Sequence, residues 1–148
     1  MLDKDGISAA LLVAEMTSML KASGLTLPDR LDQLATGYGL HATDQLSIRV
    51  DDLAVISAAM ARLRRQPPTV LIGRPVQSTE DLLPESDVVL LRADRVRVVV
   101  RPSGTEPKLK AYLEIVVPVG DEPVAAARVR AAEHLAALRA ELADALGI

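Results

Sequence analysis

Aromatic residues and cysteine are scarce or absent in this sequence. Only Tyr38 and Tyr112 carry an aromatic ring, without any Phe or Trp, so the core must be assembled from aliphatic side chains and methionine. The shortage of rings also removes the stacking surfaces on which single-stranded nucleic acid is usually held. The absence of cysteine excludes disulfides and thiolate metal sites, and it fits a reducing compartment.

Charge and hydropathy exclude two further classes of protein. The 17 basic and 20 acidic side chains leave a net charge of −3, which argues against a dedicated nucleic-acid binder with a basic surface. No apolar run approaches the length that spans a bilayer, and the N-terminus carries acids where a signal peptide needs positive charge. We therefore expect a cytoplasmic protein that binds neither nucleic acid nor membrane.

The first 40 residues predict two helices. Apolar positions recur at helical spacing over residues 7–22, and Ser8 or Asp5 can cap the start of this segment. A shorter helix should begin near Pro28, with Leu31 and Leu34 on its buried side. These helices are too small to bury their own apolar faces as an independent domain, so they must pack on the later unit, on another copy or on something missing.

The remaining residues predict the order β-α-β-β-β-β-α. Strands are expected at 41–50, 69–76, 87–92, 95–101 and 109–119, and helices at 51–65 and 124–146, with 77–86 as a loop. Consecutive strands with tight turns favour an antiparallel sheet covered by helices. We therefore expect an α+β fold over residues 41–148, with a domain boundary near Leu40 that separates it from the helical residues 1–40.

The stretch Arg101–Lys108 lies between two apolar strand candidates and concentrates groups suited to an anion. These groups are a planar guanidinium, two hydroxyls and a flexible backbone, at Arg101, Ser103, Thr105 and Gly104. Glu106 would repel a phosphate unless it points away or braces a donor. Composition alone leaves two interpretations equally open, an anion site and a hydrogen-bonded turn with a solvated basic rim.

No other residues form a set with the spacing of a catalytic or metal site. His41 and His134 are far apart in sequence, and neither has a partner at ligand spacing. Helix capping and loop solvation account for the acidic pairs at 51–52 and 80–81. We therefore predict no catalytic residue and no metal ligand in this chain.

The run at 101–108, followed by Leu-Lys-Ala-Tyr-Leu-Glu at 109–114, closely resembles the C-terminal signature of the α-D-phosphohexomutase family. That family includes phosphoglucomutases and phosphomannomutases. The run Asp-Lys-Asp-Gly-Ile at 3–7 is similar to the end of the family's third domain, as are Thr26-Leu27, Leu31-Asp32 and Tyr38-Gly39. The resemblance covers nearly the whole chain. It implies the helical tail of domain three (1–40) and a fourth, phosphate-binding domain (41–148).

The resemblance also implies a role for the loop. Its contacts to the phosphate of a hexose phosphate would be Arg101, Ser103, Gly104 and Thr105, with an electrostatic contribution from Lys108. The family's reaction moves phosphate between O1 and O6 of a hexose. It needs a phosphoserine loop, a magnesium-binding loop and a sugar-reading loop, and none of these occurs in this sequence.

Three expectations follow from the missing loops. The chain alone should not convert substrate, although it should bind the phosphate group of that substrate. Magnesium is expected only in the full-length enzyme, and the implied partners are hexose phosphate, domains one to three and, through exposed apolar surface, a second copy. The alternative is a free-standing binding or assembly module that retains the fold without catalysis.

Overall fold

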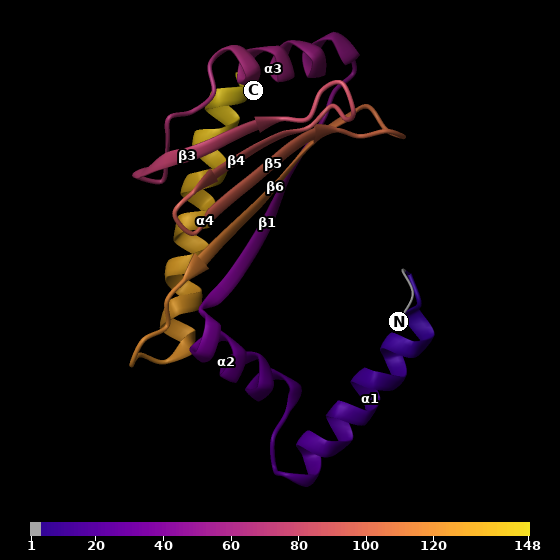
Figure 1. Cartoon of the computed structure of the whole chain (residues 1–148), viewed down its shortest axis with the longest axis vertical. Coiled ribbons are helices and arrows are strands. Elements are labelled where there is room, and N and C mark those ends of the chain that lie inside the picture. Colours follow the sequence, from indigo (N-terminus) through magenta and orange to yellow (C-terminus); the bar gives the residue numbers. More distant parts are fainter. Residues whose placement is uncertain (1–3) are drawn as a thin grey trace.

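Ten helices and strands follow one another over residues 4–148, which are the residues that the computed structural model describes (Figure 1). Four elements come first: α1 (Gly6–Ala22), α2 (Leu27–Tyr38), β1 (Leu40–Arg49) and α3 (Leu53–Arg65). Six follow: β2 (Val70–Leu71), β3 (Arg74–Asp81), β4 (Val89–Ala93), β5 (Val96–Pro102), β6 (Lys108–Val117) and α4 (Val124–Leu146). The part of the resemblance that includes Asp3 begins outside the described residues.

The strands form one antiparallel sheet in the order β1-β6-β5-β4-β3-β2. β1 pairs with β6 along its whole length, from Leu40 opposite Val117 to Arg49 opposite Lys108. β5 pairs with β6 on the other side and ends with Pro102 opposite Leu109. The far end of β1 therefore lies beside the loop that joins β5 to β6, although about 50 residues separate the two segments in sequence.

Helices α3 and α4 cover one face of this sheet and leave the other face open (Figure 1). Every second side chain of the central strands is buried under the helices, including Val98, Val100, Leu113 and Ile115. The helices contribute Met60, Leu63, Leu138 and Leu142 to the same core. Each fully buried side chain of this size contributes about 1.5–3 kcal/mol of transfer free energy. The predicted α+β fold, with its antiparallel sheet covered by α3 and α4, is confirmed.

The predicted strand at 69–76 is interrupted by a turn, and the predicted loop at 77–86 is wrong over 77–81, where β3 continues, but confirmed over 82–86. β2 and β3 form a hairpin in this region, and the chain reverses at Ile72 and Gly73. Both turn residues have positive φ angles, 43° and 73°, as two-residue hairpin turns favour. A β-branched residue rarely adopts positive φ, which is why sequence alone gave no turn there. Here the Ile72 N–H donates to Glu141 Oε2 at 2.7 Å, which helps hold the turn.

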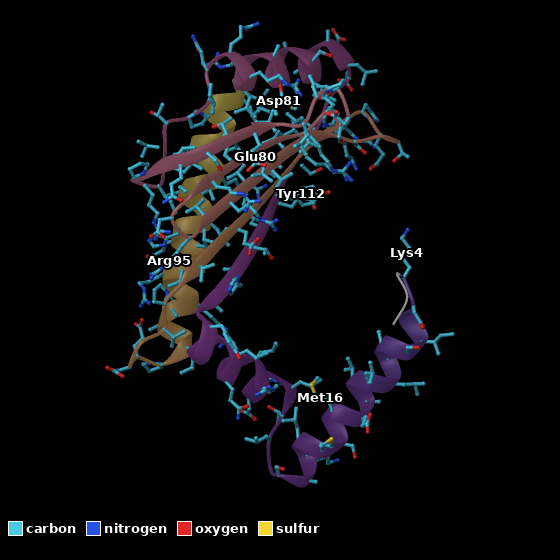
Figure 2. The ribbon with its side chains drawn as sticks, viewed as in Figure 1. Lys4, Met16, Glu80, Asp81, Arg95 and Tyr112 are labelled. Atoms are coloured by element: carbon cyan, nitrogen blue, oxygen red, sulfur yellow. The ribbon has the colours of Figure 1, made fainter. Side chains whose placement is uncertain are left out.

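Helix α1 stands away from the sheet and contributes nothing to the core. Of the two candidate caps, Asp5 is the one used, because the Ser8 N–H donates to Asp5 Oδ1 at 2.9 Å. None of its side chains is buried, and Figure 2 shows Met16 well away from the sheet. The exposed apolar side chains are those of Ile7, Leu11, Leu12, Val13, Met16 and Met19. In residues 4–148 no element covers this helix face.

Helix α2 begins at a capping box of Thr26 and Asp29 and continues directly toward β1. The predicted burial of Leu31 and Leu34 is wrong, since these side chains are 61% and 38% exposed. The reason is that α1 turns away from α2 by 92° instead of folding back on it. Among the described residues, no single helix is long and apolar enough to cross a membrane, and α1 and α2 reach that length only as this bent pair.

Candidate anion-binding site

The loop between β5 and β6 is closed by its own backbone. The Ser103 N–H donates to the Lys108 carbonyl at 2.8 Å, and the Lys108 N–H donates to the Glu106 carbonyl at 2.7 Å. A third bond joins the loop to the neighbouring strand, because the Val50 N–H donates to the Pro107 carbonyl at 3.0 Å. Figure 1 shows the loop as a narrow tip that extends beyond the sheet, on the side away from α4. The loop is therefore a braced turn.

The basic residues near this loop share the open face of the sheet. Residues directly opposite each other in an antiparallel pair point to the same face, and Arg101 lies opposite Lys110. Arg49 lies opposite Lys108 in the same way. Tyr112 follows on this face two residues beyond Lys110, and Figure 2 shows it on the side of the sheet opposite α4. The loop end of the open face therefore gathers cations from three strands.

Arg101 is held by an aromatic neighbour. Its Nη2 donates to the Tyr112 hydroxyl at 3.3 Å, and its guanidinium carbon lies 5.8 Å from the centre of the ring. A cation near the face of an aromatic ring is attracted by the ring's quadrupole. These contacts restrict a long side chain that would otherwise sample many rotamers, while the remaining guanidinium N–H groups stay available for an anion.

Glu106 braces cations, which was one of the two arrangements expected of it. Its Oε1 accepts from Lys108 Nζ at 2.9 Å and from Arg49 Nη2 at 3.4 Å. The hydrogen bond and charge of Lys108, followed by those of Arg49, lower the pKa of the Glu106 carboxyl below its ordinary value. The carboxylate is therefore ionised near neutral pH and holds two cations beside the loop.

The predicted contact residues differ in exposure along the one short segment that contains them. Ser103 is half-buried, whereas Gly104 and Thr105 are exposed at the tip. A Cβ added at Gly104 would meet no atom within 4 Å, and its φ is not in the left-handed region. The fold itself therefore makes no demand for glycine at this position. Lys108 lies at the start of β6 and is paired with Glu106.

Sequence reasoning missed Arg49 as a neighbour of the loop. The only available signal was the alternation of β1, which places Arg49 on the same face as His41 at the opposite end of the strand. Only the pairing of β1 with β6 brings Arg49 to Glu106, and the sequence did not reveal that pairing.

The open face also contains a second charged group, at the far end from the loop. Glu114 Oε2 accepts from Arg97 Nε at 2.9 Å, and Glu114 Oε1 lies 3.3 Å from His41 Nδ1. Partial burial pushes the pKa of Glu114 up, but hydrogen bonds from His41 and Arg97 outweigh it, so the pKa is lowered. Between this group and the loop, a hollow of about 670 Å³ is lined by Thr43, Gln45, Val99 and Tyr112 together with Arg97 and Glu114.

Other charged residues serve the fold. Arg64 joins Asp81 to Asp87 at 3.0 and 2.5 Å and so ties α3 to the loop between β3 and β4. His134 has an Nδ1 atom that is buried without a hydrogen-bond partner. Within residues 4–148, no three histidine, aspartate or glutamate side chains lie close enough to share a metal ion. The magnesium implied by the resemblance has no ligand set in this part of the chain.

The fold and the loop together define a small α+β domain that presents a braced, cation-rich turn at one end of an antiparallel sheet. Residues 47–136 match the family described as phosphoglucomutase/phosphomannomutase, C-terminal domain. The chain belongs to this family. The match includes the loop, five of the six strands and the end of β1 that carries Arg49.

Two relatives illustrate the extent of the similarity. The probable phosphomannomutase of Haemophilus influenzae is 39% identical over 133 residues, which cover 87% of this chain and 27% of that protein. The phosphoglucomutase of Staphylococcus aureus strain USA300 is 31% identical over 140 residues, which cover 81% of this chain and 25% of that protein. The chain thus spans about a quarter of the length of these relatives.

Proposed function

We propose that this chain is the substrate-phosphate-binding portion of a phosphoglucomutase or phosphomannomutase. Such an enzyme is an intramolecular phosphotransferase that interconverts hexose 1-phosphates and 6-phosphates. The observation that carries the proposal is the loop at 103–107. It follows Arg101, which Tyr112 restrains on the open face, and it carries the hydroxyl of the half-buried Ser103 and that of Thr105 at the exposed tip.

The groups of this loop suit a phosphate better than they suit a sugar. A guanidinium offers a planar pair of N–H donors that matches two phosphate oxygens, and the short hydroxyls of Ser103 and Thr105 can donate to the third. The loop itself offers no aromatic ring and no neutral amide side chain to read a hexose. A phosphate grip that is nearly indifferent to the sugar accepts a bisphosphate intermediate in either orientation, as the proposed reaction requires.

In this proposal the chain alone does not convert a hexose phosphate. The described residues offer a place to hold a substrate, and the chemistry is assigned to domains that precede residues 1–40 in a longer protein. In this proposal α1 and α2 are the tail of the preceding domain, and Leu40 marks the start of the phosphate-binding domain. The uncovered apolar face of α1, which includes Leu11 and Met19, would then pack on that preceding domain.

Titration of the 148-residue chain with glucose 6-phosphate tests the grip. One loop without the rest of a cleft should bind no tighter than about millimolar, because ordering and desolvation offset much of each charge-assisted hydrogen bond. We expect amide NMR shifts centred on Ser103, Gly104 and Thr105, which glucose does not produce and which Arg101→Ala removes. If no loop amide shifts at tens of millimolar ligand, the proposed grip is wrong.

Reconstitution distinguishes this proposal from a free-standing binding or assembly module. The part of the Haemophilus influenzae relative that this chain does not match, prepared separately, supplies the missing domains of the proposal. Mixing them with this chain should restore phosphate transfer between glucose 1-phosphate and glucose 6-phosphate, and Arg101→Ala in this chain should weaken it. A complex that forms but gives no transfer would favour an assembly role.

A further inference from the structure

We propose that Arg49, at the end of β1, is a further residue of the phosphate grip, and that Glu106 holds it in place for that role. This inference rests on the proposed function, because it adds a residue to the same site. It makes the site a composite of two segments, the end of β1 and the loop between β5 and β6. Arg49 lies outside the run 101–108 that carries the resemblance.

Three separate contacts fix Arg49 beside the loop. In the sheet it lies directly opposite Lys108, the first residue of β6. The next backbone group of its own segment, the Val50 N–H, donates to the Pro107 carbonyl at 3.0 Å. Its guanidinium then contacts Glu106 Oε1 at 3.4 Å. Backbone pairing and the loop hydrogen bond therefore place the residue beside the loop, and the ion pair directs its side chain toward Glu106.

The contact with Glu106 is weak enough to be exchanged. It involves one nitrogen of the guanidinium at 3.4 Å, longer than the common length of 2.7–2.9 Å for a charge-assisted bond. The Arg49 side chain is 64% exposed, so its other N–H groups face solvent. An ion pair with this exposure contributes little to stability. A phosphate that arrives at the loop can therefore take a share of the guanidinium without opening the fold.

The charge balance favours that exchange. Glu106 is one carboxylate between two cations, and it binds both through the same oxygen, with the Lys108 contact shorter at 2.9 Å. Arg49 and Lys108 together therefore keep one excess positive charge beside the loop. Arg101 and Lys110, opposite each other on β5 and β6, add to it on the same face. A phosphate dianion would offset this excess, whereas a neutral sugar would not.

Glu106 is a positioning residue in this arrangement. Without it, Arg49 and Lys108 would repel each other across neighbouring strands, and the long arginine side chain would move into solvent. With it, both cations stay beside the backbone that leads to Ser103. The Glu106 carboxylate repels the incoming phosphate to some extent, but it also keeps Arg49 and Lys108 within reach of that phosphate.

The test compares four variants of the full 148-residue chain in titrations with glucose 6-phosphate at low ionic strength, with glucose as the blank. Arg49→Gln removes the proposed donor. Arg30→Gln on α2 is the matched control, since it removes the same charge from an exposed arginine whose side chain is bonded, within residues 4–148, to Gln33 on its own helix. Arg101→Gln tests the proposed function. We expect Arg49→Gln to raise Kd by about 3- to 10-fold, Arg30→Gln to leave it unchanged, and Arg49→Lys to recover part of the loss.

Salt separates a direct role from a merely structural one. Added NaCl screens an exposed cation, so the dependence of Kd on salt should be shallower in Arg49→Gln than in the parent chain. A loss of loop order would weaken binding without changing that slope, and it would also shift the amides of Ser103 and Gly104 in the absence of ligand. In a chain that already carries Glu106→Gln, the substitution Arg49→Gln should raise Kd by a smaller factor, because Arg49 is no longer held near the loop.

The outcomes separate the two proposals. If Arg101→Gln abolishes binding and Arg49→Gln behaves like Arg30→Gln, the inference about Arg49 is wrong and the proposed function stands. If neither Arg101→Gln nor Arg49→Gln changes Kd, the proposed function and the inference about Arg49 are both wrong. A rise in Kd for Arg49→Gln with an unchanged salt slope also overturns the inference, because it assigns Arg49 to the fold of the loop alone.

Discussion

The Arg101 guanidinium lies 5.8 Å from the centre of the Tyr112 ring and donates to the Tyr112 hydroxyl at 3.3 Å. The ring and the hydroxyl hold the arginine that the proposed grip depends on. Tyr112→Leu removes both contacts and should weaken the binding of glucose 6-phosphate by about 2- to 5-fold, the equivalent of an exposed cation–π contact. Tyr112→Phe keeps the ring and should lose less. Amide NMR titration measures both.

The other tyrosine of the chain provides the control for this prediction. Tyr38 is 77% exposed at the end of α2, and no contact joins it to the loop among the described residues. Tyr38→Leu should leave the affinity of the loop unchanged. Tighter binding in Tyr112→Leu would show that the ring competes with phosphate for Arg101, contrary to the restraining role assigned here.

The brace made by Glu106 should depend on pH. Hydrogen bonding and charge from Lys108 and Arg49 lower the pKa of this carboxyl, so its contribution is fully present above the ordinary glutamate value of about 4.3. It is lost as the pH falls through the lower value of the folded chain. The Ser103 and Lys108 amides, together with the Glu106 side-chain carbonyl carbon, should therefore titrate with a midpoint below 4.3 in NMR spectra.

Lys108 is the larger cause of the lowered Glu106 pKa, so removing its charge should shift the midpoint of the Glu106 titration. Lys108→Met leaves Arg49 as the only cation on Glu106, so the midpoint should rise toward 4.3. Lys21→Met on α1 removes the same charge far from the loop and should leave it unchanged. A midpoint at or above 4.3 in the parent chain would mean that the brace does not form in solution.

Much of the fold follows from patterns that are local in sequence. The alternation at 95–101 and 109–119 predicted β5 and β6, and the helix at 124–146 was predicted with the bounds that α4 has. The hairpin of β2 and β3 was missed because its turn uses Ile72 at positive φ. The polar strand Gln77–Asp81 was missed because its side chains are largely exposed and show no apolar alternation to mark it.

The candidate site was predictable only in part, for a similar reason. Arg101, Ser103, Gly104 and Thr105 are neighbours in sequence, so their proximity needed no fold. The contact of Arg49 with Glu106 depends on the register of β1 against β6, a long-range property that local patterns do not encode. The restraint of Arg101 by Tyr112 likewise depends on how β5 lies beside β6.

The uncovered face of α1 should make the chain self-associate. Leu12 and Met19 lie on one side of this helix, 56% and 67% exposed, and line a hollow with Met16. Substituting both by Gln removes apolar surface while keeping a residue that favours helix. The apparent mass in sedimentation velocity should rise with concentration in the parent chain and rise less in the double variant.

A single exposed apolar residue elsewhere provides the control for self-association. Val129 on α4 is 60% exposed, and Val129→Gln should leave the concentration dependence unchanged. An apparent mass that does not rise with concentration in the parent chain would contradict the prediction. Equal effects of the α1 and α4 substitutions would mean that association does not use the α1 face.

Two glycines at the end of α2 should respond oppositely to alanine. Gly39 has a φ of 90°, and a Cβ there would lie 2.8 Å from the Val116 side chain on β6. With its ψ of 155°, this is a backbone conformation that essentially only glycine adopts, so another residue there costs about 1–3 kcal/mol, and the crowding against β6 adds to that cost. Gly37 lies inside the helix with nothing within 4 Å of an added Cβ, so alanine there should stabilise by about 0.5–1 kcal/mol. Urea unfolding should therefore give a lower midpoint for Gly39→Ala and a higher one for Gly37→Ala. Equal midpoints would show that α2 is not fixed to β1 at Gly39 in solution.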